Sequence, residues 1–193
     1  MGEGRRIRLN RGWNRLVNGW TTSGNVFWIS GNPFSVPSGL GTFLREDFSG
    51  TNETNTALTK GALDSLLQFR MTPTGPYMAP SSAIGPDGRG ATPGQPPFDG
   101  QLFTNPAAGN VGALQLRMFP GPPVFAMNAA LFKETRLTER ISVEIRMEAL
   151  NVFNHPAFAV FTPNMNVTSQ QFGKITAEAT TPRRMQFLLR LKF

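Results

Sequence analysis

The last ten residues of the chain alternate between apolar and polar side chains. Strand side chains point to opposite faces with a period of two, so this pattern predicts a strand with two chemically different faces. The apolar face carries Met185, Phe187, Leu189, Leu191 and Phe193. The other face carries Arg184, Gln186, Arg190 and Lys192, and only Leu188 interrupts it. One such face suits an apolar environment and the other suits water.

The length of this terminal strand favours a membrane setting. The eleven residues from 183 to 193, at about 3.3 Å each and tilted by about 45°, rise about 25 Å, which matches the apolar band of an outer-membrane barrel. An ordinary sandwich strand packed on a soluble core has the same periodicity. Because chain ends usually fray, an end on the apolar residue Phe193 favours the barrel.

Composition removes several other classes. The chain has 193 residues, 39% of them apolar and 16% charged, which is enough for a single domain with a core. It has no cysteine, so disulfides and thiolate metal sites are excluded. The longest uncharged apolar run, residues 123–132, is about half the ~20 residues of a membrane helix. No apolar segment follows the basic start at residues 1–6, so we expect no export signal within this chain.

Four segments have the alternation and β-branched or aromatic content of strands. They lie near residues 16–30, 123–133, 140–153 and 183–193. In the first, Trp20 and Trp28 are spaced for two interfacial aromatic girdles, and a pair of core tryptophans is the alternative.

The connections between these strands are very unequal. Residues 31–121 hold eleven of the sixteen prolines and one helical pattern, between Thr54 and Phe69. Residues 154–182 form a second long loop, with a short strand possible over 171–177, whereas 134–138 is a short turn. The fold class predicted is all-β, an antiparallel meander of about four transmembrane strands with long extracellular loops and a periplasmic turn.

The polar faces of the last two strands are the candidate lumen wall. The candidates are Ser142, Glu144, Arg146 and Glu148, with Arg184, Gln186 and Arg190. Paired carboxylates such as Glu144 and Glu148 can perform acid–base chemistry, but alternating charges along a water-filled wall are the simpler interpretation. His155 is the only histidine, so the chain cannot assemble a histidine-based triad or metal cluster. We therefore expect no enzyme activity, metal or cofactor.

Six segments in order along the chain carry a family resemblance. They are residues 20–36, 102–112, 137–141, 146–158, 172–176 and 182–187. Together they resemble the C-terminal end of Oar-like TonB-dependent receptors. The resemblance implies that residues 1–193 are the C-terminal portion of a 22-stranded barrel in the outer membrane of a Gram-negative bacterium. It also implies that the signal peptide, the carboxypeptidase-regulatory-like domain and the plug lie upstream of this chain.

The same resemblance implies the partners. These are the remainder of the barrel and the plug, TonB acting through that plug, outer-membrane lipid, and an unknown small ligand, glycan or peptide met by the loops. Met185, Phe187, Leu189, Leu191 and Phe193 would be the signal read by the barrel-assembly machinery. Four strands alone cannot close and would leave two open edges in lipid, so we expect the sheet to need those further strands.

Two other function classes remain as alternatives. A soluble β-sandwich binding module fits the turn-rich loops and the aromatic content, and it would express without detergent. Nucleic-acid binding is suggested by a net charge of +7 and by five arginines within the first fifteen residues. No aromatic platform is interleaved with those arginines, so we expect no nucleic-acid partner.

Overall fold

The computed structural model describes residues 18–42 and 52–193, which divide into two compact units. The sheet unit comprises the described residues up to Trp28 together with Phe125–Pro156 and Thr180–Phe193. The loop unit comprises the described residues of Ile29–Val124 and of Ala157–Ala179. None of the helices described is long and apolar enough to cross a membrane.

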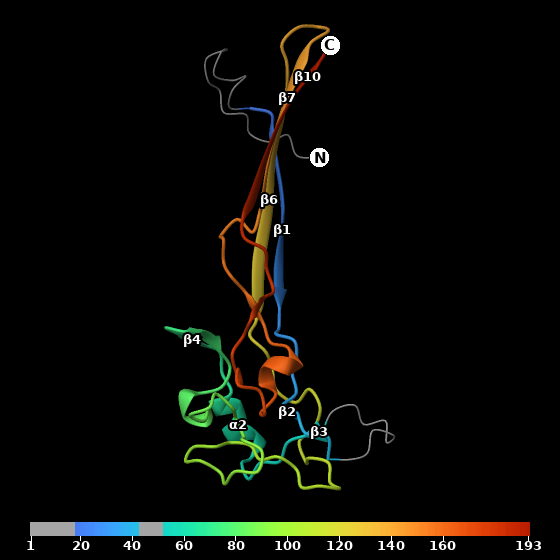
Figure 1. The fold of residues 1–193 in the computed structure, drawn as a ribbon. Coiled ribbons are helices and arrows are strands. Elements are labelled where there is room, and N and C mark those ends of the chain that lie inside the picture. The colour runs from blue at the N-terminus through green and yellow to red at the C-terminus, as the bar shows by residue number, and fades with distance from the viewer. Residues whose placement is uncertain (1–17, 43–51) are drawn as a thin grey trace. The chain divides into compact units, whose positions relative to one another are not determined.

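Four long strands form one sheet. They are β1 (Trp20–Ile29), β6 (Val124–Arg136), β7 (Ser142–Leu150) and β10 (Arg184–Lys192). Their order in the sheet is β1-β6-β7-β10, and β7 is antiparallel to both β6 and β10 (Figure 1). Each strand therefore lies beside its neighbours in this series, which confirms the predicted all-β meander.

The pairing register places most polar residues opposite polar residues and most apolar residues opposite apolar residues. Glu148 lies opposite Gln186 and Glu144 opposite Arg190, while Met147 lies opposite Phe187. Because side chains alternate along every strand, the aligned even-numbered positions of β6, β7 and β10 make one face and the odd-numbered ones the other. We call these the polar face and the apolar face.

The short connection lies later in the chain than the sequence suggested. The predicted turn at 134–138 is wrong, because β6 continues as far as Arg136. The chain reverses over residues 137–141, where the Leu137 N–H donates to the Ile141 carbonyl at 2.9 Å. Glu134 belongs to β6, where it lies opposite Glu144 and accepts a hydrogen bond from Ser142 Oγ at 3.2 Å.

The other strand predictions are confirmed with shorter bounds. β1 lies within the predicted 16–30, of which 16 and 17 fall outside the described residues. β7 ends at Leu150 rather than at 153, because Asn151 adopts a positive φ of 51° that leaves the strand conformation. β10 occupies the predicted terminal strand apart from one residue at each end.

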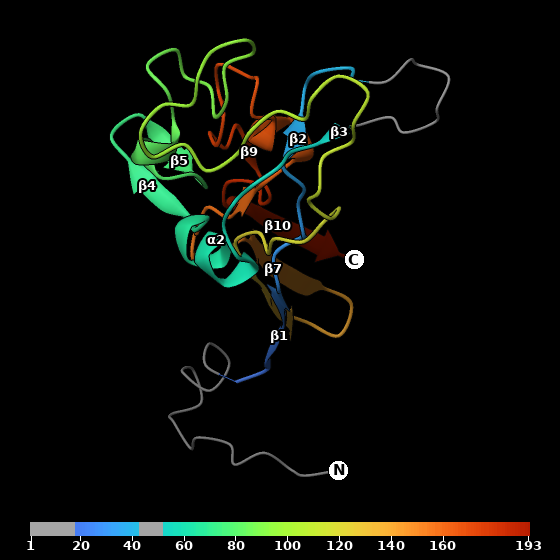
Figure 2. The ribbon, with the colours of Figure 1, turned by 90° about the horizontal axis from the view of Figure 1, so that it is seen from below.

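The loop unit is folded rather than irregular (Figure 2). Its helix, α2 (Lys60–Leu66), confirms the helical pattern over a shorter span and is capped by Thr59, whose Oγ1 accepts the Ala62 N–H. Short strands pair as β2 (Pro37–Ser38) with β3 (Asn52–Glu53), β4 (Arg70–Thr72) with β5 (Gly75–Tyr77), and β8 (Phe158–Ala159) with β9 (Ala177–Glu178). Two 3-10 turns complete it, Ser81–Ala83 and Thr162–Met165.

The predicted short strand over 171–177 is wrong for most of its length. Residues 171–173 lie in a turn, Lys174 makes a single bridge to Tyr77, and β9 begins only at Ala177. Gly173 carries a φ of +76° within that turn, a left-handed conformation that glycine adopts without steric cost and that departs from extended strand backbone.

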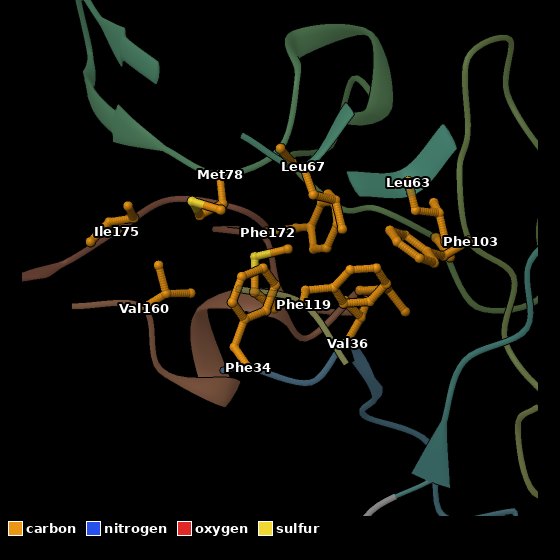
Figure 3. Close-up of a cluster of buried hydrophobic side chains, with 14 residues drawn as sticks. Phe34, Val36, Leu63, Leu67, Met78, Phe103, Phe119, Val160, Phe172 and Ile175 are labelled. Atoms are coloured by element: carbon orange, nitrogen blue, oxygen red, sulfur yellow. The ribbon is translucent and has the colours of Figure 1, made fainter. Parts of the chain in front are cut away.

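A hydrophobic core holds the loop unit together (Figure 3). Phe34 and Phe119 lie with their ring centroids 5.7 Å apart, and Phe103 meets Phe172 edge to face at 6.2 Å. All four are fully buried, and they come from both long segments that the sequence suggested to be loops. Both segments therefore contribute to one core, so the described part of 31–121, expected to be a long loop, folds as part of a compact unit.

Candidate functional site

The polar face of the sheet carries a connected set of charges. Lys192 Nζ lies 3.2 Å from Glu134 Oε1 and 3.0 Å from Glu144 Oε2, so one ammonium bridges two carboxylates on neighbouring strands. Arg190 adds a longer contact of 3.7 Å to the same Glu144 carboxylate. The directly opposed Glu134 and Glu144 would repel each other without this bridge. The wall is thus a locally balanced ionic surface on three strands.

A second ion pair continues this wall further along β7. Arg146 pairs with Glu148, two residues away on the same face. With Gln186 and Leu188 of β10, these residues line a hollow of about 140 Å³. The predicted lumen residues therefore share one face of β7 and β10, as the sequence indicated. Whether that face meets the water of a barrel lumen stays a prediction.

The carboxylates proposed as an acid–base pair do not meet. Glu144 and Glu148 are four residues apart on one strand, about 13 Å at the usual rise. Each has its own basic partner, Lys192 for Glu144 and Arg146 for Glu148. Among the residues that the structure describes, no group of three or more possible ligands could hold a metal ion.

The apolar face presents large side chains to its surroundings. Its β10 members and the terminal Phe193 are well exposed, from 56% for Leu191 to 97% for Phe193. Trp20 belongs to the same face, because the Lys133 ammonium lies 5.0 Å from its ring centroid and Lys133 is aligned with Ile145 of the apolar face. Alternation then places Trp28 on this face too, 82% exposed. Such exposure of apolar surface marks a face that meets lipid or a partner.

An asparagine corner ends the sheet beyond β7. Asn151 Nδ2 donates to the carbonyls of Thr181 at 2.9 Å and His155 at 3.3 Å, and its Oδ1 accepts the His155 N–H at 3.2 Å. Its own N–H donates to Asn128 Oδ1 at 3.0 Å. The corner therefore joins β6, the residues after β7 and the approach to β10. The histidine takes part through its backbone N–H and carbonyl.

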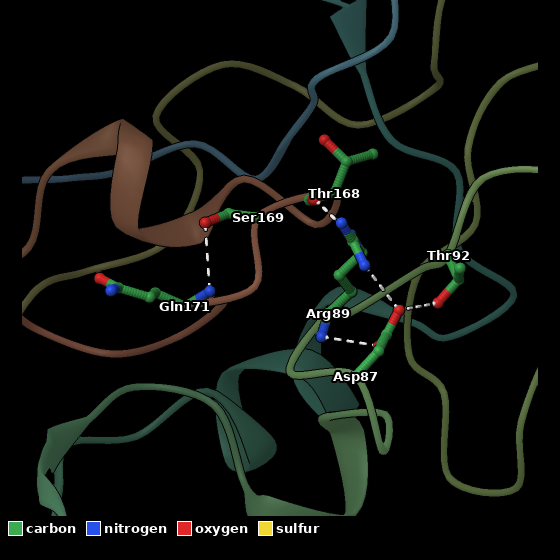
Figure 4. Close-up of polar contacts among 6 residues, drawn as sticks. All are labelled: Asp87, Arg89, Thr92, Thr168, Ser169 and Gln171. Carbon is green, nitrogen blue, oxygen red and sulfur yellow. Dashed lines mark hydrogen bonds and ion pairs between the residues drawn. The ribbon is translucent and has the colours of Figure 1, made fainter.

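In the loop unit, an ionic cluster ties the two long segments together (Figure 4). Asp87 accepts hydrogen bonds from Thr92 Oγ1 at 2.7 Å and from Arg89 Nη1 at 2.9 Å, and Arg89 Nε donates to the Thr168 carbonyl at 2.9 Å. The hydrogen bonds from Thr92 and then Arg89 lower the pKa of Asp87 to about 2. At Gly88 a side chain would collide with the Gln170 carbonyl, so the absence of a side chain there lets the two segments approach each other closely.

Glu53 is the one buried carboxylate of the described residues whose two side-chain oxygens both lack a hydrogen-bond partner. It is 7% exposed, and burial raises its pKa. A carboxyl in this setting prefers its neutral form, so the charged form opposes folding of the loop unit.

Sequence reasoning missed Lys133, Glu134 and Asn151. Glu134 was assigned to the turn, because residues 133–136 are all polar or charged and show no alternation of apolar and polar side chains. Lys133 carried no sequence signal, because a lysine at an apolar-face position breaks the pattern. The arginines of the first fifteen residues lie outside the described residues, so the structure does not place them.

One comparison identifies relatives of the chain. The family model described as an outer membrane beta barrel domain matches residues 1–186. Comparisons with curated proteins and with solved structures find no match.

Proposed function

The chain belongs to the outer membrane beta-barrel domain family, and from this premise we propose that it is part of a TonB-dependent receptor similar to the Oar-like receptors. In this proposal β1, β6, β7 and β10 are consecutive barrel strands in the outer membrane. Membership favours an outer-membrane protein over the soluble β-sandwich alternative. The receptor function itself rests on the motif resemblance and on the geometry of the sheet.

The alignment of the two faces is the observation that carries the proposal. Across β7 and β10, Glu144 lies opposite Arg190 while Ile145 lies opposite Leu189. A barrel wall needs this separation, since one side faces lipid and the other faces a polar interior. In water the exposed apolar face would instead be an aggregation site, because Leu189 is 76% exposed.

The loop unit would be the ligand-contacting part of such a receptor. Its core orders the described parts of the long segments 31–121 and 154–182, and both segments would lie outside the cell if the turn at 137–141 is periplasmic. An ordered platform binds without the entropy cost of fixing two long loops. The ligand class is a small molecule, glycan or peptide, and we assign no catalytic step and no cofactor.

The partners follow from the same proposal. The open edges of β1 and β10 would pair with further strands of the barrel, since unpaired backbone groups in lipid are costly. TonB would act through a plug encoded upstream, and the barrel-assembly machinery would recognise the apolar residues of β10 and Phe193.

Epitope insertion tests the orientation. A tag after Gly94, at an exposed turn with open space around it, should bind antibody on intact cells. The matched tag between Glu139 and Arg140 should bind only after the outer membrane is permeabilised. Binding of the second tag on intact cells would contradict the proposed orientation.

The upstream coding sequence tests the receptor assignment. Reading in frame before Met1, we expect a signal peptide, a plug and further alternating strands. A stop codon and a ribosome-binding site directly before Met1 would contradict a TonB-dependent transporter.

A further inference from the structure

A row of three side chains crosses the hairpin of β4 and β5 in the loop unit (Figure 2). Arg70 of β4 lies opposite Tyr77 of β5, and Tyr77 forms an antiparallel bridge with Lys174 on its other side. Residues that lie directly opposite each other in antiparallel pairing point to the same face. The two basic side chains therefore flank the tyrosine on one face.

This face points away from the hydrophobic core of the loop unit. Met78 and Ile175, the residues that follow Tyr77 and Lys174, are buried members of that core. Because side chains alternate along extended backbone, Tyr77 and Lys174 point to the opposite side. Both side chains and that of Arg70 are half-buried, so each is held by its surroundings and still reaches solvent.

No carboxylate of the described residues pairs with either cation of this row. The ion pairs of the described loop unit lie elsewhere, and they join Lys60 with Asp64 and Arg89 with Asp87. The Lys174 ammonium donates no hydrogen bond to the described residues. Its side chain extends along β5, because its Cε lies 4.0 Å from the position that a Cβ on Gly75 would take. The row therefore carries positive charge that the described loop unit does not balance.

Arg70 is held in place by the backbone. Its Nη1 donates to the carbonyls of Leu66 at 2.8 Å and Gln68 at 3.1 Å, with a longer contact to the Met78 carbonyl at 3.5 Å. These bonds use one nitrogen of the guanidinium, and its Nε and Nη2 donate to none of the described residues. A charge fixed in this way binds an anion with little further loss of side-chain freedom.

Tyr77 places an aromatic surface between the two charges. Its ring stacks on no other aromatic ring of the described residues, and its hydroxyl makes no hydrogen bond to them. A pyranose ring has an apolar C–H face and hydroxyls on its edge, which match an aromatic ring with a polar tip. A carboxylate on such a sugar would meet Arg70 or Lys174 in a charge-assisted hydrogen bond.

We propose that Arg70, Tyr77 and Lys174 form a binding site for an acidic sugar, a uronate residue of a glycan. The two cations bind the carboxylate, and the tyrosine supports the sugar ring. This inference rests on the proposed function, because it names the ligand class of the loop unit. All three residues belong to that unit.

Calorimetric titration with two forms of one glycan tests the site. The protein purified from outer membranes in detergent micelles is titrated with a short oligogalacturonate. A parallel titration uses its fully methyl-esterified form, which keeps the sugar rings and lacks the charges. We expect the acid to bind more weakly as salt rises, and the ester to bind at least about tenfold more weakly than the acid. Equal binding of both forms, or binding of neither, would overturn the site.

Variants locate the binding. Lys174→Gln should weaken binding of the acid about tenfold, since a hydrogen bond to a charged group contributes about that factor. Tyr77→Phe keeps the ring, so it should weaken binding less than Tyr77→Ala. Lys60→Gln is the matched control, because it removes a charge of the same unit that is already paired with Asp64. Unchanged binding by Lys174→Gln, or equal losses for Lys174→Gln and Lys60→Gln, would overturn the site.

An acidic peptide is the competing ligand. Oligoglutamate carries carboxylates without a sugar ring, so it should displace the oligogalacturonate poorly. Displacement at equal concentrations would overturn the assignment of a sugar. Absence of antibody binding to the tag after Gly94 on intact cells would overturn the proposed function, whereas failure of the titrations alone would overturn only the sugar site.

Discussion

Asn151 is the residue whose removal should most weaken the end of the sheet. Its side chain makes three hydrogen bonds, two as donor and one as acceptor, and it is 5% exposed. At about 1 kcal/mol each, Asn151→Ala loses about 3 kcal/mol. Alanine at a φ of 51° adds about 1 kcal/mol of left-handed strain. We therefore expect a destabilisation of about 4 kcal/mol.

Two further substitutions at Asn151 separate the contribution of the hydrogen bonds from that of the backbone strain. Asn151→Gly loses the hydrogen bonds without the strain, so it should cost about 3 kcal/mol. Asn151→Asp keeps the acceptor for the His155 N–H, but it places a buried carboxylate oxygen against the Thr181 and His155 carbonyls, so it should cost more than Asn151→Gly. Glycine should therefore be the least destabilising of the three substitutions.

The assay is urea unfolding of the protein folded in detergent micelles, followed by tryptophan fluorescence. Trp20 and Trp28 both belong to the sheet unit, so the signal reports its unfolding. Asn154→Ala is the control for the left-handed strain, because Asn154 has a φ of 49° but is exposed and its side chain accepts the Arg183 N–H. Losses of stability below about 1 kcal/mol for both Asn151→Ala and Asn151→Gly would refute the claim that the Asn151 hydrogen bonds stabilise the end of the sheet.

Three more predictions concern charge and assembly. Hydrogen bonds lower the pKa of Asp87, so its ionised carboxylate stabilises the loop unit at pH values above the unfolded pKa of about 3.9, and this stabilisation is lost as the pH falls towards about 2. Thermal unfolding at stepped pH should show this loss of stability, and Asp87→Asn should remove the pH dependence. Burial raises the pKa of Glu53, so the loop unit should lose stability as the pH rises above the unfolded pKa of about 4.3 and through the raised folded pKa. Glu53→Gln should raise the melting temperature at pH 8 and change it little at low pH. An unchanged melting temperature at pH 8 would contradict the claim that the buried Glu53 charge destabilises the loop unit. Phe193→Ser should lower the amount of assembled protein in outer-membrane fractions, whereas Lys192→Gln should lower it less; equal wild-type levels of the Phe193 variant would remove its role as an assembly signal.

The strand faces were predictable from sequence because their signal is local. The alternation in 140–153 and 183–193 shows which residues share a face, and pairing in the sheet then aligns those faces. The turn at 134–138 was misplaced because adjacent charged residues resemble a turn, whereas Glu134 lies within β6 and contacts Lys192, 58 residues away.

The core of the loop unit could not be predicted in this way. Phe103 and Phe172 stand singly among turn residues, without the period of a helix or strand. They are buried because distant segments meet: the Phe172 ring packs against Gly90, where any side chain would collide with it. Such contacts have no signature in a single sequence.

The central claim is that the two faces of the sheet meet lipid and water respectively. The chain has no cysteine, so single cysteines for spin labels can be placed along β10 without a background variant. In outer-membrane vesicles, labels at Phe187 and Leu189 should collide mainly with oxygen dissolved in lipid. Labels at Gln186 and Arg190 should collide mainly with a water-soluble nickel complex. Accessibility alternating with period two is the result expected, and equal accessibility at all four positions would contradict the claim.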